Sequence, residues 1–155
     1  MSRIMTKRDE LRWSVLQAGR EQSIDTIMFH QAIADRLGLN PTDHKCADLL
    51  HLKGAMSAGE LAEVTGLTTG AITGVIDRLE KAGFVERKAD PNDRRRVIIQ
   101  TIPGQCRKIG QLFESMAGSL FELCGKYSNE ELNTILDFMK SSKAVVHQEL
   151  IKLRG

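Results

Sequence analysis

The chain has 155 residues, of which 41% are apolar and 27% charged, and this composition fits one soluble globular domain with a sizeable core. Its longest uncharged stretch, residues 64–76, is interrupted by threonine and glycine and is too short to span a bilayer. Three widely spaced cysteines, Cys46, Cys106 and Cys124, form no C-x-x-C pair. They argue against a disulfide framework and fit a reducing compartment.

The formal net charge is only +2, but the charge is unevenly placed. Residues 78–108 hold nine Lys/Arg against four Asp/Glu, so the rest of the chain is net negative. This polarity indicates an anionic partner on one face. A membrane surface would also be anionic, although no strongly amphipathic basic helix accompanies the patch. Because residues 1–8 lack the apolar core of a signal peptide, we expect a cytoplasmic protein.

The first predicted helix covers residues 9–37 and ends at Gly38, with a break near Gly19 left open. Its apolar positions at helical spacing are candidates for burial. They are Leu16, Ile24, Ile27, Met28 and Ile33. A small domain cannot cover all of them, so part of this helix should pack on the C-terminal helices or on another subunit.

Asn40 is the predicted cap of the next helix, with Pro41 at the first position, where a missing N–H costs nothing. Gly54 ends that helix. The following helix begins at Ser57, because Ser57 and Glu60 form the S-x-x-E pattern in which both side chains satisfy unpaired backbone donors. It ends at Gly66.

A tight turn follows Gly66, and the next helix has Thr68 as its cap and Gly83 as its end. Its buried face is predicted from Ile72, Val75, Ile76 and Leu79. The opposite face is small near the start and charged further on. It carries Thr69, Gly70, Thr73, Gly74, Asp77 and Arg78.

Two glycines four residues apart on an exposed helix face are costly, at roughly 0.5 to 1 kcal/mol each relative to alanine. Close approach of a second surface would explain them, and a helix in the DNA major groove presents its first residues to the bases. A merely solvated, weakly stable face would also fit. This helix alone does not separate the two interpretations.

Strand-like content on both sides of a turn-rich segment predicts a hairpin from residues 84–88 and 97–102. Arg94, Arg95 and Arg96 stand at its tip. Three arginines in a turn are usually only solvated. Beside a helix-turn-helix, however, they favour nucleic-acid contact, because a guanidinium can enter the minor groove or hold a phosphate.

Two long helices complete the chain. One opens at Pro103 and Gly104 and keeps helical spacing to about Lys126, and Ser128 starts the last one with a second S-x-x-E pattern. Long amphipathic helices outside a compact unit must bury their apolar stripes. A two-fold dimer is the commonest solution.

These residues resemble the MarR (multiple antibiotic resistance regulator) family of winged helix-turn-helix transcription factors. The resemblance rests on Leu61 and Ala62, on residues 75–85, and on residues 90–96 followed by an aliphatic strand. The chain departs from the family in having Thr101-Ile102-Pro103-Gly104-Gln105 where Leu-Thr and a later glycine usually close the wing. This chain therefore differs from the family at the entry into the next helix.

The resemblance implies a mainly α fold with a small β-hairpin wing, in one domain of residues 1–155. Residues 39–102 would be the winged helix-turn-helix DNA-binding head, and residues 1–38 and 103–155 the dimerisation helices. The 68–82 helix would be the recognition helix, residues 85–102 the wing, and Asp93 the residue that braces a wing arginine. The expected DNA-binding residues are Ser57, Thr68, Thr69, Gly70, Thr73, Gly74, Arg78, Arg94, Arg95 and Arg96.

We therefore expect a homodimeric regulator that binds a pseudo-palindromic double-stranded operator, acts as a repressor and responds to a small-molecule effector. Its effector residues are unknown, although Trp13 and His30 could line a crevice if they are not simply packed. The histidines and cysteines lack metal-ligand spacing, and no catalytic motif is present, so we expect no cofactor, metal or enzyme activity. The alternative is a winged helix that docks an acidic protein partner through its basic wing.

Overall fold

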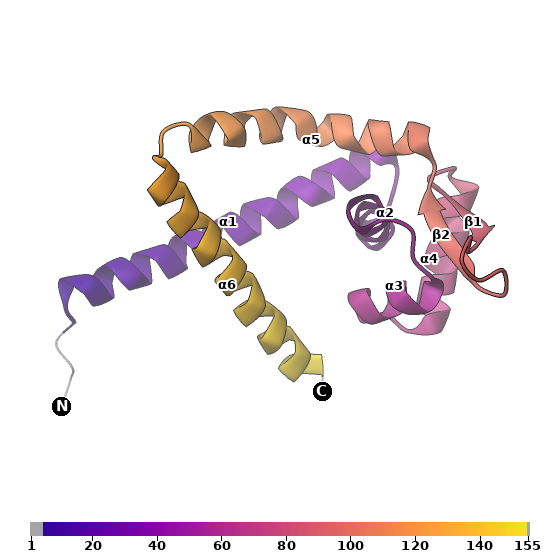
Figure 1. Cartoon of the computed structure of the whole chain (residues 1–155), viewed down its shortest axis with the longest axis horizontal. Coiled ribbons are helices and arrows are strands. Elements are labelled where there is room, and N and C mark those ends of the chain that lie inside the picture. Colours follow the sequence, from indigo (N-terminus) through magenta and orange to yellow (C-terminus); the bar gives the residue numbers. More distant parts are fainter. Residues whose placement is uncertain (1–4, 155) are drawn as a thin grey trace.

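The computed structural model describes residues 5–154. Residues 1–4, which belong to the segment 1–8 considered above for a signal peptide, lie outside the described residues. Six helices and one hairpin follow one another along the chain (Figure 1). They are α1 (Lys7–Leu37), α2 (Pro41–Lys53), α3 (Ala58–Thr65), α4 (Thr69–Lys81), β1 (Val85–Ala89), β2 (Val97–Thr101), α5 (Pro103–Cys124) and α6 (Asn129–Arg154). The mainly α fold with a hairpin wing is confirmed.

The helix ends follow the capping residues that the sequence predicts. Ser57 and Glu60 form a complete capping box at the start of α3, and Gly66 ends that helix with a left-handed φ of 72°. Asn40 caps α2 ahead of Pro41, and Thr68 caps α4 by accepting from the Ala71 N–H. α5 begins at Pro103 without a side-chain cap, which is where the chain departs from the family pattern.

The hydrophobic core lies in the compact unit at one end of the molecule, where α2, α3, α4 and the hairpin meet (Figure 1). Its largest fully buried side chains include Leu50, Leu61, Ile72, Ile76, Leu79 and Ile99. Burial of such side chains contributes about 1.5 to 3 kcal/mol each, so this packed unit supplies much of the stability of the chain. We call it the head, residues 39–102.

The hairpin pairs β1 with β2 antiparallel, with Val85 opposite Thr101 and Ala89 opposite Val97. Its first strand begins at Val85, one residue later than the sequence pattern indicates, because the Phe84 N–H bonds back to Leu79 of α4. β2 is also tied to the loop before α3, where Met56 and Ile99 exchange two backbone hydrogen bonds of 3.1 and 2.8 Å. The base of the wing is therefore part of the head.

α1, α5 and α6 extend beyond the head as long rods (Figure 1). α1 runs unbroken through Gly19, so no break occurs there. Among the predicted buried positions of α1, only Ile33 is buried, whereas Leu16, Ile24, Ile27 and Met28 are exposed. The prediction is wrong for those four within one chain, because only the last turns of α1 reach α2.

Large apolar side chains are also exposed on α5 and α6. Those of α6 include Leu136, Phe138, Met139, Val145, Val146, Leu150, Ile151 and Leu153, and none of the residues of that helix is buried. Across the described residues, every helix is too short or too polar to cross a membrane.

Candidate nucleic-acid interface

α4 presents the face that the sequence predicts for base contact. Ile72, Val75, Ile76 and Leu79 are buried against the head, while Thr69, Gly70 and Thr73 are exposed. The Thr73 hydroxyl donates to the Thr69 carbonyl at 2.9 Å, so its methyl group and oxygen lone pairs remain available. A Cβ built on Gly70 would meet nothing within 4 Å. Packing within this chain therefore does not require a glycine at this position.

Arg78 lies further along α4 and has a partner in its own chain. Its Nε and Nη2 donate to the two carboxylate oxygens of Asp43 on α2, at 2.8 and 2.7 Å. The Asp43 side chain is only 3% exposed, whereas that of Arg78 is 54% exposed. Hydrogen bonding from Arg78 therefore satisfies a buried charge, and it raises the pKa of Arg78. Arg78 joins α4 to α2, which sequence spacing does not reveal.

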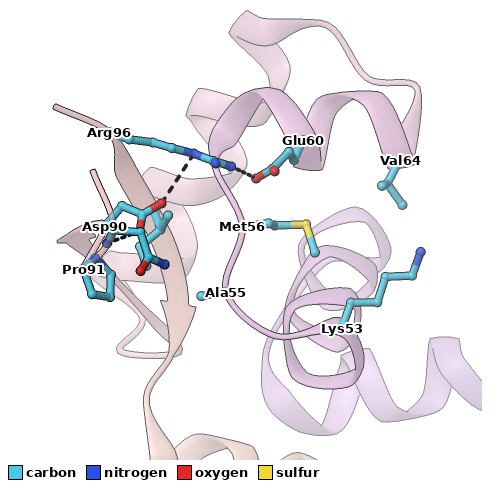
Figure 2. Close-up of a pocket in the computed structure, with 10 residues that line it drawn as sticks. Lys53, Ala55, Met56, Glu60, Val64, Asp90, Pro91 and Arg96 are labelled. Carbon is cyan, nitrogen blue, oxygen red and sulfur yellow. Dashed lines mark hydrogen bonds and ion pairs between the residues drawn. The ribbon is translucent and has the colours of Figure 1, made fainter. Parts of the chain in front are cut away.

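The three arginines at the wing tip are not equivalent. Arg94 and Arg95 are exposed, and the Arg95 side chain is 93% exposed. Asp93 accepts from the Arg95 backbone N–H at 3.0 Å and from its Nε at 3.3 Å, which is the contact expected of a bracing carboxylate. Arg96 instead points away from the tip and forms ion pairs with Glu60 of α3 and with Asp90 (Figure 2).

Ser57 and Thr68 serve first as helix caps. The Ser57 hydroxyl accepts from the Glu60 N–H and donates to the Glu60 carboxylate, and the Thr68 hydroxyl accepts from Ala71 at 3.3 Å. Hydrogen bonds from Arg96 and Ser57 lower the pKa of Glu60 to about 2, so Glu60 is ionised at neutral pH. Both caps lie at helix N-termini, where backbone N–H groups favour anions.

Arg87 is a structural residue that the sequence interpretation missed. From β1 its guanidinium reaches Asp77, at 2.5 Å, and Glu80, both on α4. These contacts raise the pKa of Arg87. The spacing of ten and seven residues crosses a turn, so no helical periodicity could indicate the pairs. They hold the first strand of the hairpin against α4.

Ion pairs within the chain engage several of the basic side chains of residues 78–108. Of the nine Lys/Arg in that stretch, Arg78, Arg87, Lys88, Arg95 and Arg96 pair with carboxylates in the described residues. Arg94 and Arg95 stay exposed at the wing tip, and Lys81, Arg107 and Lys108 are also exposed. The hairpin that carries the two wing arginines packs against α4 through β1.

A separate cavity of about 430 Å³ lies between α1 and α2. His30 of α1 and His44 of α2 line it, with a ring nitrogen of each 3.3 Å apart. His44 is buried, and its Nδ1 has no hydrogen-bond partner in the described structure. Burial lowers the pKa of His44, which favours its neutral form. Trp13, by contrast, is exposed far along α1 and does not line this cavity.

Among the side chains that the structure describes, His, Cys, Asp and Glu form no cluster of three that could hold a metal ion. Cys46 is fully buried, and desolvation raises the pKa of its thiol to about 11. A buried neutral thiol is a packing group, because the thiolate is the reactive form.

Comparison with known proteins agrees with this geometry. The MarR family model matches residues 39–97, which span most of the head. YcgE of Bacillus subtilis, an HTH-type transcriptional regulator, is 45% identical over 147 residues, which is 95% of this chain and 96% of that protein. MhqR of the same organism, also an HTH-type transcriptional regulator, is 31% identical over 66% of this chain and 71% of its own.

Solved structures show the same fold. A MarR family protein from Bacillus stearothermophilus has a TM-score of 0.66 at 22% identity, covering 95% of this chain and 99% of that one. MarR of Escherichia coli in its apo form has a TM-score of 0.55 at 22% identity, covering 91% and 98%. The chain belongs to the MarR family of winged helix-turn-helix, DNA-binding transcriptional regulators.

Proposed function

We propose that this regulator binds a pseudo-palindromic double-stranded operator as a homodimer, with α4 in the major groove and the wing on the minor groove or phosphates. One observation carries the proposal: α4, which exposes Thr69, Gly70 and Thr73, packs against β1 of the hairpin whose loop exposes Arg94 and Arg95. Threonine can hydrogen-bond a base or touch a thymine methyl, and guanidinium groups bind phosphate.

The exposed apolar side chains of α1, α5 and α6 support dimerisation. Single chains rarely leave so many large apolar groups in water, and a second copy would cover them. A dimer would place two recognition helices on successive major grooves, about 34 to 36 Å apart. Two half-sites would then supply the selectivity that one small head lacks.

The cavity between α1 and α2 supports control by a small-molecule effector. It lies where a dimerisation helix meets the head, and its walls combine apolar side chains with His30, His44 and Lys45. An effector that binds one arrangement of the dimerisation helices more tightly than another would shift the spacing of the two heads. Only the difference between its two affinities can drive that shift. We propose that the bound dimer represses by covering a promoter in the cytoplasm.

The experiment is selection of bound fragments from genomic DNA, followed by fluorescence anisotropy on the selected duplex. We expect affinity to fall by orders of magnitude between about 50 and 200 mM salt. Thr69→Ala or Thr73→Ala should alter which base is preferred, whereas Arg94→Ala should weaken binding to all sequences. A protein that selects no duplex but binds acidic proteins would instead be an interaction module.

A further inference from the structure

Arg96 leaves the wing tip and reaches across to α3. Figure 2 shows its side chain extended between Glu60 of α3 and Asp90 at the start of the wing loop. Its Nη2 pairs with the Glu60 carboxylate and lies 3.5 Å from the Ser57 hydroxyl, and its Nε lies 3.8 Å from Asp90. The guanidinium is thus already bound to carboxylates from two segments.

The Arg96 backbone closes the loop that carries the other two arginines. The Asp90 N–H donates to the Arg96 carbonyl at 2.8 Å, and the Arg96 N–H donates to the Asp93 carbonyl at 2.9 Å. Arg94 and Arg95 lie between those anchor points. Any motion of Arg96 relative to α3 would therefore move both exposed arginines.

The same Glu60 oxygen that pairs with Arg96 also accepts from the Ser57 backbone N–H at 2.7 Å and from its hydroxyl at 2.9 Å. One carboxylate therefore caps α3 and holds the wing. If Arg96 bound a DNA phosphate instead, the ionised Glu60 would lose its cationic partner while lying near the anionic duplex. That electrostatic cost opposes a phosphate role for Arg96.

We propose that Arg96 is a positioning residue, which fastens the wing to α3 through Glu60 and so fixes Arg94 and Arg95 relative to α4. The ion pair replaces the DNA contact expected for Arg96. Together with Arg87, which ties β1 to α4, it makes the wing and both helices of the helix-turn-helix one rigid unit. This inference rests on the proposed DNA-binding function.

Glu60→Gln is the decisive variant, because glutamine still completes a capping box but no longer pairs with Arg96. If Arg96 positions the wing, this change weakens DNA binding by about threefold, the size of an exposed ion pair, even though it removes a negative charge. If Arg96 binds phosphate, the same change frees the arginine and tightens binding. The two models predict opposite signs.

Further variants separate positioning from direct contact. Arg96→Gln should weaken binding without changing the salt dependence, and the double variant Glu60→Gln/Arg96→Gln should bind no worse than either single one. Arg95→Gln should lower the slope of log affinity against log salt by about 0.9. Glu63→Gln removes the same charge from α3 and should not weaken binding. Equal slopes for Arg96→Gln and Arg95→Gln would overturn the proposal.

Hydrogen exchange of the free protein gives a readout that does not need DNA. We expect the Asp90 and Arg96 amides to exchange several-fold faster in Glu60→Gln and at the wild-type rate in Glu63→Gln. Unchanged exchange in Glu60→Gln would refute the fastening role by itself. A wild-type protein that binds no duplex would refute the proposed function while leaving this test intact.

Discussion

Asp43 and Arg78 join α2 to α4 through two parallel hydrogen bonds of 2.8 and 2.7 Å. The carboxylate is buried and also accepts from the Asn40 side-chain amide at 2.9 Å, so it is fully engaged inside the head. α2 in turn contacts α1, which extends out of the head. This pair therefore lies on the physical connection between α1 and the α4 face that we propose to contact DNA.

We predict that Asp43→Ala lowers the free energy of unfolding by about 2 kcal/mol, because the charged hydrogen bonds that cross from α4 to α2 are lost. Chemical denaturation measures the change. Asp25→Ala removes an exposed carboxylate from α1 and should change it by less than about 0.5 kcal/mol. Equal changes for the two substitutions would show that the Asp43–Arg78 pair stabilises the fold no more than an exposed carboxylate does.

Gly70→Ala should separate stability from function. The added methyl group meets no atom within 4 Å, and alanine is favoured over glycine in a helix by about 1 kcal/mol, so thermal stability should rise. DNA affinity should fall, because the same methyl group occupies the space that the duplex needs. A stabilised variant with wild-type affinity would mean that no surface approaches α4 at Gly70.

Leu120→Asp combined with Val146→Asp tests the dimer. Both side chains are exposed in the single chain, so charge should cost little within it, whereas burial against a second copy would make the carboxylates costly. Light scattering at micromolar concentration should report a monomer with reduced DNA affinity. Lys143→Asp changes charge on the same helix and should leave a dimer. A wild-type monomer would contradict this arrangement.

His44 should make stability depend on pH. Burial lowers its pKa below the ordinary value of 6.5, so the unfolded chain binds a proton more readily than the folded one. The free energy of unfolding should therefore fall as pH drops through about 6.5 toward the lower folded pKa. His44→Gln should flatten that slope between about pH 7.5 and 5.5 in chemical denaturation. A slope unchanged by His44→Gln would assign the dependence to other groups.

Local signals in the sequence predict the helix boundaries well. The capping box of Ser57 and Glu60, the Asn40–Pro41 start and the left-handed Gly66 all act within four residues. Their geometry needs no knowledge of the fold. The family resemblance then supplies the arrangement of these elements, because its motifs cover the helix-turn-helix and the wing.

Contacts between distant segments are what the sequence does not reveal. Arg78 and Asp43 are 35 positions apart, and Arg96 and Ser57 are 39 apart, so neither pair follows a periodicity. The sequence therefore predicts Arg78 and Arg96 as DNA-binding residues without indicating their ion pairs. Leu16 and Met28 are exposed within one chain for a related reason, since helical spacing indicates an apolar stripe without indicating what covers it.

We propose that α4 and the arginine-bearing wing grip one duplex together. The most direct test of this proposal is the salt dependence of binding to the selected duplex, compared between wild type and the Arg94→Ala/Arg95→Ala variant. We predict that the variant binds at least tenfold more weakly at about 100 mM salt and that its slope against log salt falls by about 2 per head. An unchanged affinity and slope would contradict the account.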